Sequence, residues 1–408
     1  MGKSVLLCKK LFNVKAQTVD TDMAVFVDGE KIEKVCKQSS PADYVGYEII
    51  DMGDKFVMPG VIDCHLHLSK NGTAHTLAIK PYMTVGKATL LAQKNAQTDL
   101  LAGFTTVRSC GDIGYCDIDL RNAINQGLTW GPRVVAAGSL ISSTGGPSCG
   151  RYSPYIIEET VMYGVSADGE AELRKAVRNN IKYGADFIKF MATGGAMTVG
   201  NKLDSMHLSE EEIRVVIETA DNYGVVSSVH AHGPRGIKAC AKAGVTSIEH
   251  GSIMDEECIE IIREKGQYVI PTFLVAERAI KYGPELGSPE STIQKSRDIA
   301  RVHEHWFQRC LEEKIKIAFG TDTNSPGNKH GDQAEEFFFM VKNGMTEMQA
   351  LTAATKTASE LLRMENEIGS IDAGKYADII AFDIDPLKDI KAMMNCAFVM
   401  KGGVIFKQ

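Results

Sequence analysis

The stretch Val57-Met-Pro-Gly-Val-Ile-Asp-Cys-His-Leu-His-Leu68 carries the strongest fold signal in the chain. Its Pro-Gly pair ends one segment, and a short apolar run then carries two histidines two residues apart. Side chains alternate between the two faces of a β-strand, so His65 and His67 point to the same side. Neutral imidazole is the commonest protein ligand for metal ions, and two imidazoles on one side offer a cation two nitrogens. A buried strand with two hydrogen-bonded histidines is the simpler alternative.

A second pair, His303 and His305, lies in a helical pattern. Residues two apart on a helix diverge, so this pair lacks the geometry of a metal site. We therefore predict a surface position for both residues.

The sequence after the first stretch repeats one pattern: a helical segment, a glycine and a short apolar strand. A glycine directly after a helix is typical of a left-handed C-terminal cap. The pattern occurs five times, at Gly103, Gly184, Gly224, Gly244 and Gly266. With segments 61–68, 133–137 and 316–320 the strands number eight, which predicts a (β/α)8 TIM barrel. A doubly wound sheet would need a glycine-rich phosphate loop after its first strand, where this chain has two histidines.

Both ends of the chain have the pattern of small antiparallel sheets. Residues 1–56 alternate short apolar runs with turns such as Asp28-Gly29, which is typical of hairpins. Strand and turn patterns return after residue 365. We predict a small β-sandwich domain from residues 1–56 and 365–408, beside a barrel of residues 57–364.

Length, composition and charge limit the possible functions. The chain has 408 residues, of which 44% are hydrophobic and 24% charged, and this fits a globular protein with a large core. A net charge of -7 without a run of Lys or Arg argues against nucleic acid or a membrane surface as partner, so we expect a small-molecule substrate. No apolar run has the length of a leader core or a transmembrane span, so we expect a cytoplasmic protein. We also expect a homo-oligomer.

Candidate metal ligands follow the predicted strands, at the end of the barrel where active residues lie. The ten cysteines include no Cys-x-x-Cys pair, so a metal would need His, Asp, Glu or Lys. Such side chains stand on five of the eight strands: His65, His67, Lys189, His230, His232, His250 and Asp322. They exceed what one tetrahedral zinc ion needs, which favours a binuclear centre.

Lys189 lies in the apolar run Phe187-Ile-Lys-Phe-Met-Ala192. A buried ammonium without a partner is costly. We expect Lys189 either to pair with a carboxylate or to be carboxylated by carbon dioxide, and the resulting carbamate would bridge two divalent ions.

Taken together, these motifs resemble the amidohydrolase superfamily over nearly the whole chain. The resemblance rests on Met58-Pro-Gly-Val-Ile-Asp-Cys-His-Leu-His67, Lys189, Val229-His-Ala-His-Gly233, Ser247-Ile-Glu-His-Gly251, Gly320-Thr-Asp322 and Gly369-Ser-Ile-Asp-Ala-Gly-Lys-Tyr-Ala-Asp378. The His-Ala-His-Gly, Ile-Glu-His-Gly and Ala-Thr-Gly-Gly runs are similar to a branch of zinc dipeptidases and carboxypeptidases. That branch acts on Xaa-Pro or Xaa-Arg/Lys dipeptides and is related to imidazolonepropionase.

The resemblance implies a centre of two zinc ions or other divalent ions. Its ligands would be His65, His67, Lys189, His230, His250 and Asp322. The first two would bind the buried ion and His230 and His250 the more exposed one, while Lys189 would bridge them as a carbamate. Asp322 would also carry the proton during catalysis.

The resemblance also bears on substrate recognition. His232 would either hydrogen-bond to a metal ligand or, as the resemblance suggests, meet the carbonyl or carboxylate of the substrate, with an arginine such as Arg108 or Arg151. The branch often has Thr-Gly-Gly-His after the third strand, whereas this chain has Thr144-Gly-Gly-Pro147 and lacks that histidine. This difference bears on the assignment of a dipeptide substrate and not on the metal ligands. The loops expected to set specificity are 109–119, 139–155, 193–206 and 324–332.

We therefore predict a metal-dependent hydrolase that cleaves an amide bond of a dipeptide or N-acyl amino acid, with a metal-bridging hydroxide as nucleophile. A cyclic-amide hydrolase or deaminase of the imidazolonepropionase type is the enzymatic alternative. A non-catalytic barrel that serves as an interaction protein is disfavoured, because it has no use for the full ligand set.

Overall fold

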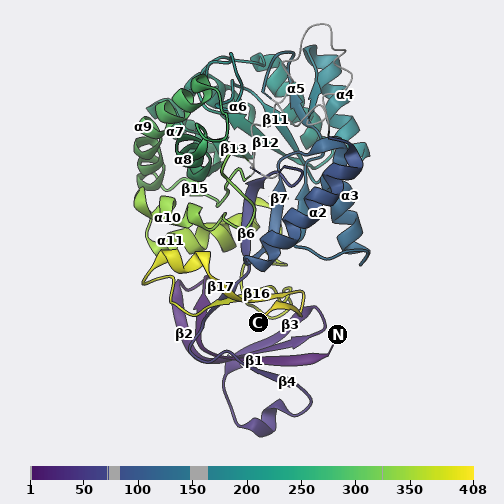
Figure 1. Cartoon of the computed structure of the whole chain (residues 1–408), viewed down its shortest axis with the longest axis vertical. Coiled ribbons are helices and arrows are strands. Elements are labelled where there is room, and N and C mark those ends of the chain that lie inside the picture. Colours follow the sequence, from purple (N-terminus) through teal and green to yellow (C-terminus); the bar gives the residue numbers. More distant parts are fainter. Residues whose placement is uncertain (1, 71, 73–82, 148–163, 324) are drawn as a thin grey trace.

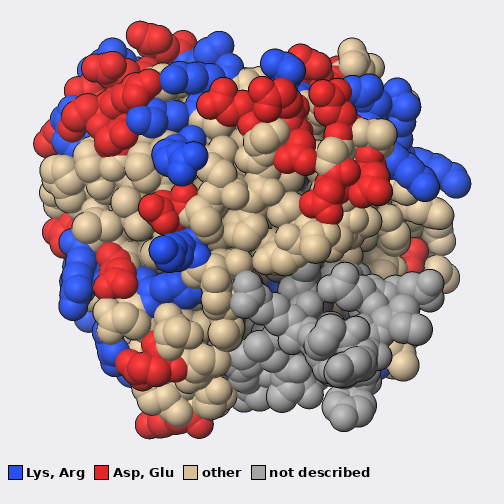
Figure 2. Space-filling model, turned by 90° about the horizontal axis from the view of Figure 1, so that it is seen from above, with Lys and Arg blue, Asp and Glu red and all other residues tan. Residues whose placement is uncertain are grey.

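The structure is a computed structural model that describes residues 2–70, 72, 83–147, 164–323 and 325–408. It has two parts: a barrel surrounded by helices and, below it, a small β domain that contains both ends of the chain (Figure 1). Seen from above, acidic and basic side chains are mixed along one side of the barrel face, next to a mostly uncharged middle (Figure 2). None of the described helices is long and apolar enough to span a membrane.

The barrel consists of eight short parallel strands. They are β6 (Val61–Leu66), β7 (Phe104–Ser109), β8 (Arg133–Ala136), β11 (Phe187–Met191), β12 (Val226–Ala231), β13 (Ser247–His250), β14 (Tyr268–Ile270) and β15 (Lys316–Ile317). Two backbone hydrogen bonds join the two runs of strands into a ring: Asp186 N–H donates to Ala136 C=O at 2.8 Å, and Cys64 N–H to Phe319 C=O at 2.9 Å. The predicted barrel is confirmed. Two further strands, β9 (Leu140–Ser142) and β10 (Gly164–Ser166), continue the sheet beside β11.

Helices surround the strands on the outside. They are α2 (Val85–Leu101), α3 (Cys116–Asn125), α4 (Gly169–Lys182), α5 (Glu210–Asp221), α6 (Pro234–Ala243), α7 (Glu256–Lys265), α8 (Phe273–Tyr282), α9 (Glu290–Glu312), α10 (Glu335–Lys342), α11 (Glu347–Thr352) and α12 (Ala358–Leu361). The five glycines predicted as caps have φ between 65° and 102°, the left-handed region that such caps require. A capping box of Ser209 and Glu212 begins α5, and one of Thr346 and Gln349 begins α11.

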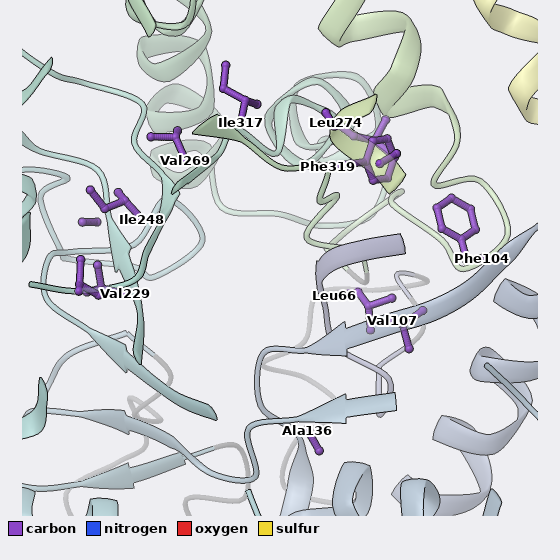
Figure 3. Close-up of a cluster of buried hydrophobic side chains, with 14 of the residues drawn as sticks. Leu66, Phe104, Val107, Ala136, Val229, Ile248, Val269, Leu274, Ile317 and Phe319 are labelled. Carbon is purple, nitrogen blue, oxygen red and sulfur yellow. The ribbon is translucent and has the colours of Figure 1, made fainter. Parts of the chain in front are cut away.

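The barrel strands alternate between two environments. Leu66, Val107, Val229 and Ile248 belong to the apolar layer that the strands share with the helices (Figure 3). Their neighbours along each strand, such as His65 beside Leu66, point the other way, into the barrel. Because burial of a Val, Leu or Ile side chain stabilises a fold by about 1.5–3 kcal/mol, this layer fixes which residues face the interior.

The small domain is built from both ends of the chain, as predicted. Its strands are β1 (Lys3–Asn13), β2 (Thr18–Asp28), β3 (Lys31–Lys37), β4 (Glu48–Asp51), β5 (Phe56–Pro59), β16 (Ile379–Phe382), β17 (Cys396–Lys401) and β18 (Val404–Lys407). They form one mixed sheet in which β5 joins β1 to β16. The division at residues 56/57 and 364/365 stays a prediction.

Candidate active site

β6 and the residue that follows it present two histidines to the interior of the barrel. His65 and His67 are buried, and the protein binds the Nδ1 atom of each: Glu249 Oε2 lies 2.7 Å from that of His65, and the Gly111 carbonyl 2.6 Å from that of His67. An imidazole that donates from Nδ1 presents the lone pair of Nε2 to a metal. Both Nε2 atoms face Asp322, whose Oδ1 lies 3.7 Å from that of His65 and 3.4 Å from that of His67. The pair therefore converges as the strand pattern predicts.

Three further histidines lie beside this pair. His230 is in β12, His232 follows that strand, and His250 ends β13. The centroids of these three rings are 4.6 to 4.8 Å apart. Ring nitrogens of the three lie within 4.8 Å of one another, and the same limit holds for ligand atoms of His65, His250 and Asp322. Because His250 belongs to both groups, the structure contains two adjoining sets of possible metal ligands.

Burial keeps four of these imidazoles neutral, those of His65, His230, His232 and His250. It lowers the pKa of His65 to about 4 and that of His232 to about 3. It also holds the pKa values of His230 and His250 well below their ordinary value. Neutral imidazole binds metal, whereas the protonated ring does not, so these residues are ready to act as ligands.

Two of the candidate ligands sit on strained backbone. His250 has φ 70° and Asp322 has φ 48°, and Thr272, which bonds His250 Nδ1 at 2.7 Å, has φ 50°. Left-handed residues other than glycine cost on the order of 1–3 kcal/mol each and concentrate at functional sites. Burial alone would raise the pKa of Asp322, but the adjacent His67 and His65 and the charge of Lys70 lower it below its usual range. Asp322 is therefore an ionised carboxylate.

Lys189 projects from β11 into the same cavity. Its Nζ is buried without a hydrogen-bond partner among the described residues, and burial lowers its pKa. The neighbouring carboxylate of Glu249 is already bound by Arg108 at 2.7 Å and by His65. A pairing of Lys189 with a carboxylate, one of the two explanations from the sequence, is therefore not found in the described part of the chain.

This donor set fits a divalent metal centre. The described lining of one cavity contains buried imidazoles, one carboxylate and a buried amine that has no hydrogen-bond partner within the described part of the chain. Nitrogen and oxygen ligands of this kind suit zinc, and manganese and iron accept them as well. The amine fits the set once it is carboxylated, since it then offers two anionic oxygens in place of a repelled ammonium.

His303 is not on the surface, so that prediction is wrong for one residue of the pair. It is 4% exposed, packs on Phe273 with ring centroids 4.3 Å apart and lines the cavity, whereas His305 is exposed. The two residues diverge as expected on a helix. The error lay in placing both outside, because one face of α9 packs against the mouth of the barrel.

Arg108 does not reach the cavity, so the structure contradicts its expected contact with a substrate carboxylate. Its guanidinium is 1% exposed and donates to Glu249, Ser247 and the Cys64 carbonyl. It thus forms a buried ion pair with Glu249 inside the barrel. Arg151, the other candidate, lies outside the described residues.

The pattern of the strands did not identify several residues of the site. Glu249 orients His65, Lys70 lines the cavity, and Lys295 from α9 binds a loop of its wall. Glu249 had the clearest signal, since a carboxylate inside a short apolar strand needs partners. Pro147 lines the cavity, so the departure seen in the sequence lies in the wall of this cavity.

Known proteins resemble this chain in both sequence and structure. A family model described as the amidohydrolase family matches residues 56–406. Ochratoxinase of Aspergillus niger is 34% identical over 376 residues, which cover 86% of this chain and 75% of that protein. A crystal structure of a Xaa-Pro dipeptidase with bound methionine in the active site matches with a TM-score of 0.90 and 35% identity, over 100% of both chains. Imidazolonepropionase of Fusobacterium nucleatum is more distant, with 22% identity over 404 residues, 92% of this chain and 88% of that protein.

Proposed function

The chain belongs to the amidohydrolase family, and we propose that it hydrolyses an amide bond of a dipeptide or an N-acyl amino acid. One observation carries this proposal: buried histidines, Asp322 and a lysine that has no hydrogen-bond partner among the described residues share one cavity at the carboxyl ends of the barrel strands. The names of two relatives, a Xaa-Pro dipeptidase and ochratoxinase, support the class of bond.

We assign the binding of two divalent ions to six residues. They are His65, His67, Lys189 in its carboxylated form, His230, His250 and Asp322. Such ions, when bound, lower the pKa of a water molecule and polarise the carbonyl of the substrate. Carboxylation of Lys189 supplies an anion where positive ions gather, whereas an ammonium there would be repelled.

We assign the movement of the proton to Asp322. Its carboxylate is ionised, faces the first pair of histidines and keeps 18% of its side-chain surface exposed in the cavity. It takes a proton from the attacking water and gives it to the leaving amine. A positioned acid–base group of this kind typically contributes about a hundredfold to ten-thousandfold to the rate.

We assign the free carboxylate of the substrate to His232 and Lys70. Both line the cavity, and Ser252 Oγ binds His232 Nδ1 at 3.1 Å, which holds the ring in place. Lys70 binds the substrate carboxylate in place of Arg108, which does not reach the cavity. A charge-assisted contact with a carboxylate is worth about 1.5–3 kcal/mol, enough to make the carboxylate a requirement.

Metal removal tests the reaction class. Treatment with a chelator is expected to abolish release of amino acids from a library of dipeptides and N-acyl amino acids, and zinc or manganese should restore it, because the six ligands then regain their cations. Metal content per chain and amine release are measured on the same samples. Less than about half an equivalent of metal in the purified protein would favour a non-catalytic barrel. Hydrolysis of cyclic amides alone would favour the imidazolonepropionase type.

Amidation of the substrate tests carboxylate recognition. Substrates with an amidated C-terminus are expected to lose about tenfold to a hundredfold in kcat/KM relative to the free acids. His232→Asn should shrink that difference while metal content stays unchanged, whereas His305→Asn, at an exposed position of α9, should leave it as it is. Equal rates for amidated and free substrates in the unmodified enzyme would refute this recognition.

A further inference from the structure

We infer that the cavity contains a subsite for an uncharged, apolar side chain of the substrate, and that Lys295 of α9 is the positioning residue that shapes it. The inference rests on the proposed amide hydrolysis and narrows its substrate class. The subsite lies between the loop that follows β11 and the helices α8 and α9.

Apolar side chains from two sources line this part of the cavity. They are Ala196, Met197 and Val199 from the loop, and Val275, Ala276 and Ile299 from the two helices. The three loop residues and Val275 are half-buried in the structure, so an apolar group of the substrate would cover surface that water now reaches. Ligand sites are commonly apolar with a few polar groups that fix orientation, and here the histidines and Asp322 are those polar groups.

One ammonium group ties the loop to the helix. Lys295 Nζ donates to the carbonyls of Gly195 at 2.7 Å, Thr198 at 2.6 Å and Asn201 at 3.4 Å. An ammonium has three donors, and three carbonyls of this loop lie within its reach. Residues 194–205 form no helix or strand. Lys295 therefore determines how far the loop stands from Ile299, which lies one turn further along α9.

Pro147 adds a third apolar element to the lining of the subsite, beside the loop and the two helices. A Cβ placed on Gly195 would lie 3.4 Å from the Cβ of Pro147, so the proline ring is in contact distance of the loop. The related branch often has a histidine at this position, and its replacement by proline removes a hydrogen-bond donor and adds an apolar surface.

The charges of the lining argue against a basic side chain in the substrate. Among the described residues that line the cavity, Asp322 is the one carboxylate, and it belongs to the metal centre. Apart from Asp322, the described lining thus offers no counter-ion to a lysine or arginine side chain of the substrate, and Lys70 lines the same cavity. The described lining therefore favours an uncharged, apolar side chain of the substrate.

A series of substrates that differ in one side chain tests the inference. The unmodified enzyme is expected to cleave dipeptides and N-acyl amino acids with Leu, Met or Phe side chains at least about tenfold better in kcat/KM than those with Gly or Lys. Lys295→Met should lower kcat/KM for the apolar members about tenfold, mainly through KM, and change the Gly member less than about twofold. A loop that has merely lost stability would lower all members alike, so the Gly substrate reports on folding in the same variant.

Two further variants complete the experiment. Arg297→Met removes a cation from an exposed part of the same helix, where it pairs with Glu290 at 2.8 Å, and should leave the preference unchanged. Lys295→Arg, which keeps donors for the loop carbonyls, should restore part of it. A uniform loss for all substrates in Lys295→Met, or a wild-type preference for Lys side chains, would overturn the inference while amide hydrolysis itself stands. If no amide is cleaved at all, the proposed function fails, and the inference fails with it.

Discussion

Asp322→Asn is expected to keep its metal and to lose about a thousandfold in kcat. Asparagine preserves the shape of the side chain and one oxygen ligand, but its amide cannot accept a proton. Asp322 carries the one carboxylate among the described residues that line the cavity, so no other described lining carboxylate can take over its role. Turnover is measured on the best amide from the library, and metal content by elemental analysis of the same preparation.

A neighbouring substitution separates this effect from a disturbed loop. Ser325 also lines the cavity but carries no acid–base group, so Ser325→Ala should keep turnover within about threefold of the unmodified enzyme. Near-normal turnover of metal-loaded Asp322→Asn would exclude this residue as the proton carrier. Loss of metal in that variant would instead assign it a larger part in binding the ions.

The fold could be predicted because its signals are local. A left-handed glycine ends a helix through its own backbone freedom, and Gly103 and Gly184 show this with φ of 102° and 95°. Alternation along a strand likewise needs no knowledge of the rest of the chain, so His65 and His67 could be assigned to one side. Strands β9 and β10 have three residues each, too few to show a period, and the sequence did not predict them.

The rest of the site depends on packing between distant elements. The burial of His303 was not predicted, because the contacts of α9 with other elements determine which of its faces points to the barrel. A signal was nevertheless present, since His303 lies four residues from both Ile299 and Phe307, and all three are buried on one stripe of the helix. No comparable pattern marks Lys295, whose three acceptors lie 94 to 100 residues away in the sequence.

The second large effect is expected at Lys189. Lys189→Ala should lose most of its bound metal and at least about a hundredfold in turnover, because the cavity then lacks the proposed carbamate that would hold two cations together. Short-chain carboxylic acids such as acetate or propionate should restore part of both, since alanine leaves room for a carboxylate in the place of the carbamate. Metal content and amine release are measured with and without the added acid.

Lys189→Met is the matched control, because methionine fills the space of the lysine side chain and offers no room for an added acid. It should lose metal like the alanine variant and gain nothing from acetate. In the unmodified enzyme, labelled carbon dioxide should give a carbamate signal in carbon NMR, and this signal should be absent from both variants. The buried Nζ has no partner in the described structure, so an unmodified amine would leave its burial uncompensated. Full metal occupancy of Lys189→Met, or a metal-loaded enzyme without a carbamate signal, would refute carboxylation of Lys189.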